Sequence, residues 1–186
     1  MSGPVQRYGA VAMALHWAVA AMIVAQYFIA EAAEELPRGV EQIEMYALHK
    51  SLGMTVLLLA LVRIAWRFVQ APPPPVPMAA WQTRASQVAH WGLYALLFAL
   101  PLSGWMYSSA ENFPVSVWGV VQLPDLVAPS ESLADLLHEV HEVLFFVLLA
   151  VAGLHVAAAL KHQFLDGDGV LLRMLPGRSA SSGGEA

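Results

Sequence analysis

Four long apolar segments alternate along the chain with shorter polar or proline-rich segments. Each apolar segment has about the 20 residues or more that a helix needs to cross a lipid bilayer. We therefore predict an all-α membrane protein, a four-transmembrane-helix bundle with up-down-up-down topology. The predicted spans are residues 10–30, 46–69, 85–107 and 133–160.

The segments between and after these spans are not expected to form transmembrane helices. Residues 71–77 are mostly proline and predict a stiff, extended connector. Residues 112–130 contain three prolines and predict a longer external loop with room for a short surface helix. We interpret residues 1–178 as one membrane domain and the serine- and glycine-rich residues 179–186 as a disordered tail.

Composition supports a membrane protein over an ordinary globular domain. Apolar residues make up 58% of the chain and charged residues only 12%. Cysteine is absent, which excludes disulfides, thiolate metal sites and cysteine-ligated iron–sulfur clusters. Any metal chemistry must therefore use other ligands.

The basic residues predict the orientation. Of nine Lys and Arg residues, all but Arg38 and Lys50 fall on one side of the predicted bundle. Because basic residues collect on the cytoplasmic side, we expect both termini to be cytoplasmic. The opposite loops are acidic, which argues against binding of nucleic acid. The seven basic residues on the cytoplasmic side are Arg7, Arg63, Arg67, Arg84, Lys161, Arg173 and Arg178.

Histidines are the candidate functional residues, because ionisable side chains are costly inside a membrane. Fourteen residues separate His141 from His155, which places both on nearly the same helix face about 21 Å apart. The topology then predicts two levels. His49 and His141 share the outer level, and His16 and His155 share the inner level. His90 and His162 lie close to the inner level, whereas His138 is expected to be a solvated residue at the helix end.

Haem explains two facing histidines better than zinc does. Zinc usually gathers three or four protein ligands, whereas two imidazoles suit the axial positions of a haem iron. Without a Cys-x-x-Cys-His motif, the haems are expected to be non-covalent b type. Gly53 and Gly153 would let the porphyrin approach the backbone, and Arg63 lies at the depth of a propionate.

Several short motifs occur in an order that resembles the bacterial cytochrome b561 family over residues 7–176. The N-terminal half has Arg-Tyr at 7–8, Leu-His-Trp at 15–17, Leu-His-Lys-Ser-Leu-Gly at 48–53 and Pro-Leu-Ser-Gly-Trp at 101–105. The C-terminal half has His-Glu at 141–142, Leu-His at 154–155, Ala-Ala-Leu-Lys-His at 158–162 and Leu-Arg-Met-Leu-Pro at 172–176.

This resemblance implies a di-haem b cytochrome of the bacterial inner membrane that moves electrons between the outer side and ubiquinone. Carried over by position, His49 and His141 hold the outer haem, and His16 and His155 hold the inner haem. The alternative inner pair, His16 with His90, stays open. A histidine near the inner haem, His90 or His162, is suited to donate a hydrogen bond to a quinone and to relay protons.

Some small members of the family are superoxide oxidases, and this is the specific activity that the resemblance favours. The acidic outer face would repel superoxide unless Lys50 provides a local positive charge beside His49. A second hypothesis is a membrane anchor cytochrome that accepts electrons from a separate periplasmic dehydrogenase or cytochrome. A third is a metal-transporting or purely structural helical bundle.

Overall fold

A computed structural model describes residues 6–177 and contains the four predicted helices. All four are long and apolar enough to cross a membrane, which confirms the all-α four-helix fold. All four helices extend beyond the predicted spans at one or both ends, since a helix can continue where it reaches water. The helices are α1 (Ala10–Glu35), α2 (Val40–Val69), α3 (Ala80–Ala110) and α4 (Glu131–Lys161).

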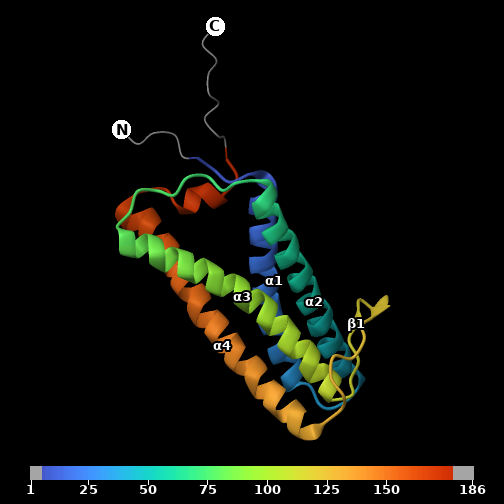
Figure 1. Cartoon of the computed structure of the whole chain (residues 1–186). Coiled ribbons are helices and arrows are strands. Elements are labelled where there is room, and N and C mark those ends of the chain that lie inside the picture. Colours follow the sequence, from blue (N-terminus) through green and yellow to red (C-terminus); the bar gives the residue numbers. More distant parts are fainter. Residues whose placement is uncertain (1–5, 178–186) are drawn as a thin grey trace.

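The helices pack as two neighbouring hairpins (Figure 1). α1 lies against α2, α3 lies against α4, and α2 joins the two hairpins through its contact with α3. A small core of Val19, Val56, Ala60 and Leu97 fills the space between α1, α2 and α3. In the described part of the chain, α1 and α4 do not pack closely along their backbones. Space therefore remains between the two hairpins.

The outer surface of the bundle is apolar. Large side chains such as Phe28, Phe68, Phe146 and Leu154 are each more than 60% exposed. A water-soluble bundle would bury residues of this size, so their exposure is that of a protein solvated by lipid.

The connection between α3 and α4 is the predicted external loop, but it holds a β-hairpin where a short surface helix had room to form. It forms a two-stranded hairpin of β1 (Ser116–Val117) and β2 (Val121–Gln122). Trp118 and Gly119 both have positive φ, at 55° and 67°, as the two central residues of a type I′ turn do, and the Val120 N–H donates to the Val117 carbonyl to close this turn. The Ser51 hydroxyl on α2 accepts a hydrogen bond from the Trp118 backbone N–H and fixes the hairpin on α2.

The first and last described segments of the chain meet at the opposite end of the bundle (Figure 1). After α4 the chain continues as a π-helix, η1 (His162–Asp166), and a short 3₁₀ helix, η2 (Leu171–Met174). The Tyr8 N–H donates to the Arg173 carbonyl, and the Arg173 guanidinium donates to Pro74 in the extended connector. The predicted disordered tail, 179–186, lies outside the described residues.

Candidate functional site

A cavity of about 500 Å³ lies between the four helices at the hairpin end of the bundle. Apolar side chains such as Leu97, Phe145 and Leu148 form much of its wall. His49 of α2 and His141 of α4 face each other across it, with ring centroids 6.3 Å apart and planes at 74°. The structure thus brings together the two residues predicted for the outer level.

The second predicted pair meets nearer the chain termini. His16 of α1 and His155 of α4 have ring centroids 6.3 Å apart and planes at 69°. The two pairs have the same separation although they join α4 to different helices. His155 also lies 5.2 Å from the ring of His90 on α3, centroid to centroid.

These separations fit an iron ion between each pair of rings. Two metal–nitrogen bonds of about 2 Å each, added to the radii of two imidazole rings, give a centroid separation of about 6 Å. His49 with His141 and His16 with His155 match this value. The ring of His90 instead lies 5.2 Å from the ring of His155, which is shorter than two rings on opposite sides of one iron require. The separation of 6.3 Å between His16 and His155 therefore favours His155 as the partner of His16.

The surroundings fit haem rather than a bare ion. Within residues 6–177, neither pair gathers a third imidazole or carboxylate close enough to share one ion. Zinc would lack the three or four ligands that it usually takes. At the outer pair, a large cavity with apolar walls instead suits a porphyrin, whose iron would need only two imidazole ligands.

His141 is held in the orientation that a metal ligand needs. Its Nδ1 lies 3.1 Å from the Leu100 carbonyl oxygen and 3.0 Å from Ser103 Oγ. Because a carbonyl only accepts, Nδ1 carries the proton and Nε2 keeps its lone pair for a metal. Gly104 packs directly on the ring, since a Cβ there would lie 3.0 Å from His141 Cε1. These three contacts were missed by sequence reasoning, although Ser103 and Gly104 lie in the Pro-Leu-Ser-Gly-Trp motif and Leu100 directly precedes it.

His49 is fixed mainly through its backbone. Its carbonyl accepts a hydrogen bond of 2.9 Å from Gln26 Nε2 on α1, and its own Nδ1 is buried without a hydrogen-bond partner among the described residues. Gly53 lines the same cavity and leaves room for Gln26, because a Cβ there would lie 3.1 Å from Gln26 Nε2. Gly153 has open space where a Cβ would point.

Arg63 lies at the level of the inner pair. Its Nη1 donates to the carbonyl of Ala12, one helical turn before His16, and its Nε donates to the Tyr94 hydroxyl. Since a guanidinium has five N–H donors, others stay available for an anionic group.

Lys50 lies at the wall of the outer cavity, but its ammonium group already has partners. Nζ donates to Ser108 Oγ and to the carbonyls of Phe113 and Pro114, and it lies 3.4 Å from the centroid of the Phe113 ring. These contacts hold a positive charge beside His49.

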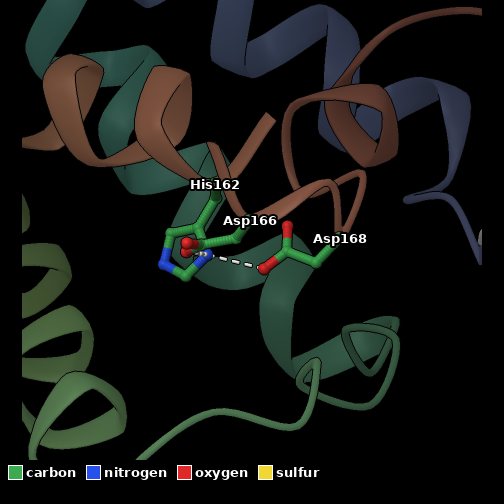
Figure 2. Close-up of side chains that lie close together, drawn as sticks. All are labelled: His162, Asp166 and Asp168. Carbon is green, nitrogen blue, oxygen red and sulfur yellow. Dashed lines mark hydrogen bonds and ion pairs between the residues drawn. The ribbon is translucent and has the colours of Figure 1, made fainter. Parts of the chain in front are cut away.

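His162 is positioned by carboxylates that sequence reasoning did not single out. Figure 2 shows its ring close to Asp166 and Asp168, and Nδ1 lies only 2.6 Å from Asp168 Oδ2. The Asp-Gly-Asp-Gly sequence at 166–169, which begins at the last residue of the π-helix, was the available signal. His138 is exposed, as predicted, and its ring packs on Tyr107.

Comparison with known proteins gives full-length matches. The family model for prokaryotic cytochrome b561 matches residues 7–177. Cytochrome b561 homolog 2 of Escherichia coli is 34% identical, with 96% of each chain covered. The probable superoxide oxidase CybB of Yersinia pestis is 30% identical over 92% of this chain and 97% of its own. Cytochrome b562 of Cereibacter sphaeroides is 29% identical over 90% of this chain and 94% of its own.

Proposed function

The chain belongs to the prokaryotic cytochrome b561 family, and from this premise we propose that it holds two b-type haems and carries electrons to ubiquinone. Membership supports transmembrane electron transfer through b-type haem in a multi-pass bacterial membrane protein. The observation that carries the finer proposal is the equal separation of 6.3 Å in two histidine pairs that share α4.

The proposed ligands are His49 and His141 for the outer haem, and His16 and His155 for the inner haem. When bound, haem supplies an iron that gains and loses one electron. Ser103 and the Leu100 carbonyl bind Nδ1 of His141, so Nε2 on the other side of the ring stays available as the haem ligand. Arg63 is the proposed partner of an inner propionate.

The distribution of basic residues supports an orientation with the termini in the cytoplasm. Six described basic residues lie at the end of the bundle where the termini meet, as the positive-inside rule requires of a cytoplasmic face. In this orientation, His49 and His141 lie near the periplasmic side of the inner membrane, and His16 and His155 lie near the cytoplasmic side. The six are Arg7, Arg63, Arg67, Arg84, Lys161 and Arg173.

His90 and His162 are the proposed quinone-side residues. Reduction of ubiquinone to ubiquinol takes up two electrons and two protons, and an imidazole can deliver protons near neutral pH. His90 is exposed beside His155, and Nδ1 of His162 is held by Asp168. If this role is right, His90→Ala or His162→Ala should impair quinone reduction while both haems are retained. Unchanged quinone binding and activity in both variants would contradict it.

Superoxide is the proposed electron donor. Two superoxide anions would each lose one electron and leave as dioxygen, and the two electrons would reduce one ubiquinone. The similarity to a probable superoxide oxidase supports this donor, as does the ammonium group of Lys50 at the wall of the outer cavity.

The charge of the outer cavity favours a second candidate. Glu34, Glu111 and Glu142 also line it, and their carboxylates repel a small anion but attract a basic protein. On this alternative, the chain is the membrane anchor cytochrome of a separate periplasmic dehydrogenase or cytochrome.

One purified preparation tests these proposals in sequence. A dithionite-reduced minus oxidised spectrum should give two b haems per chain, and a superoxide-generating system should then reduce the haems and added ubiquinone. Haem that is not reduced by superoxide would favour the anchor cytochrome. Folded protein that binds no haem would instead favour a metal-transporting or structural bundle.

A further inference from the structure

Three metal-ligating side chains converge just beyond the end of α4, away from the proposed haem ligands. Nδ1 of His162 lies 2.6 Å from Asp168 Oδ2 and 3.1 Å from Asp166 Oδ2 (Figure 2). One ligand atom from each of the three residues falls within 4.8 Å of the other two. In the described part of the chain, this is the only group of three or more such residues.

The local backbone holds this arrangement in place. The π-helix puts His162 and Asp166 on one turn. Gly167 and Gly169 then adopt φ of 67° and 72°, which reverses the chain and returns Asp168 to the imidazole. The Val170 N–H donates to Asp168 Oδ1, which orients the carboxylate and leaves Oδ2 directed at the imidazole.

We propose that His162, Asp166 and Asp168 bind one divalent transition-metal cation, with Zn²⁺ as the representative ion. An imidazole and two carboxylates are accepted zinc ligands, and water would complete a four-coordinate site. Ligand atoms around a tetrahedral zinc lie about 3.4 Å apart, so the present separations of 2.6 and 3.1 Å need to open by less than about 1 Å. Binding of the cation needs neither haem nor quinone, so a measurement of zinc affinity is independent of the quinone role proposed for His162.

Access to the site is open from the water side. The Asp166 and Asp168 side chains are 32% and 23% exposed, whereas His162 is 13% exposed. The cation would therefore enter between the carboxylates and meet the imidazole at the base of the site.

The ammonium group of Lys161 competes with the cation for one carboxylate oxygen of Asp166. Its Nζ lies 2.7 Å from Asp166 Oδ2, the same oxygen that faces His162. A metal ion must displace this ammonium or share the oxygen with it. Removing the charge by Lys161→Gln should therefore strengthen metal binding, an effect that general disruption of the loop would not produce.

The test is calorimetric titration of tag-free, haem-loaded protein with Zn²⁺ in detergent. We expect one site per chain, binding weakened about tenfold or more by His162→Gln and by Asp168→Asn, and tighter binding in Lys161→Gln. Asp125→Asn, a matched carboxylate change in the outer loop, should leave the affinity unchanged. The haem spectrum shows whether each variant is folded.

Two results would overturn the proposal. One is equal zinc affinity in the parent, His162→Gln and Asp168→Asn proteins. The other comes from X-ray absorption of the zinc-loaded parent, which needs no variant and should show nitrogen and oxygen ligands with a single imidazole. Several imidazoles around the zinc would place it elsewhere.

Discussion

The imidazole rings of His49 and His141 face each other across the outer cavity with their centroids 6.3 Å apart. Their partners at the other level, His16 and His155, repeat this separation. Since His141 and His155 belong to the same helix, α4 fixes the spacing of the two pairs along the bundle at about 21 Å. One rigid element thus sets the position of both proposed haem centres.

Gly104→Ala should selectively disturb the outer centre. The new Cβ would lie 3.0 Å from Cε1 and 3.2 Å from Nδ1 of His141, so the ring must shift by a few tenths of an ångström and strain its hydrogen bonds with Leu100 and Ser103. We expect haem content to fall from two towards one per chain, measured by the pyridine haemochrome against protein concentration.

Gly92→Ala is the matched control in the same helix, because a Cβ there has no neighbour within 4 Å. It should retain both haems and be neutral or slightly stabilising, by up to about 1 kcal/mol. Equal haem content in the two variants would show that the Gly104 contact does not position His141.

The sequence was sufficient for the spans and for the pairing of histidines by depth. Long apolar runs leave few alternatives to helices, and a fourteen-residue spacing fixes a helix face whatever packs against it. To predict which histidines pair across helices, only the order of the spans and the position of each histidine within its span are needed. His49 with His141 and His16 with His155 are therefore predictable from local features.

The contacts that orient those histidines could not be predicted in the same way. The Leu100 carbonyl is a backbone group, and its approach to His141 depends on how α3 and α4 pack. The hairpin around Trp118 was also missed, because a bulky residue rarely adopts positive φ and because the hydrogen bond with Ser51 is a tertiary contact. Periodicity carries no information about either contact.

A comparison of His155→Leu with His90→Leu should identify the inner ligand. His155 has the separation from His16 that a shared metal requires, whereas His90 only contacts the His155 ring. We expect His155→Leu to lose one haem per chain and His90→Leu to keep two, as measured by difference spectra and haem quantification. The reverse result would make His16 and His90 the inner ligands.

Lys50→Glu should slow superoxide-driven haem reduction if superoxide is the donor. The substitution reverses the charge beside His49 within a cavity already lined by Glu34, Glu111 and Glu142. We expect a decrease of about tenfold at low ionic strength that shrinks as salt is added. Stopped-flow absorbance of the haem bands measures the rate.

Lys50→Gln separates charge from structure in this experiment. Both variants lose the ammonium contacts with Phe113 and Pro114, but only Glu introduces a negative charge. The Glu variant should be the slower of the two, and equal rates would mean that Lys50 supports the loop rather than attracting the anion.

Arg173→Met should destabilise the end of the bundle where the termini meet. Arg173 is 8% exposed and donates to the carbonyls of Gln6 and Pro74 at 3.0 and 2.6 Å. Loss of these charged hydrogen bonds should cost about 2–4 kcal/mol, seen as a lower thermal midpoint in detergent. Arg84→Met is the control, because Arg84 is exposed and has no hydrogen bond or ion pair within the described chain.

The Trp17 indole beside His16 donates to the Met174 carbonyl in the same segment as Arg173. We therefore expect the Arg173→Met protein to lose the inner haem at a lower temperature than the outer haem. If it instead loses both haems together, at the thermal midpoint of Arg84→Met, this segment does not support the inner site.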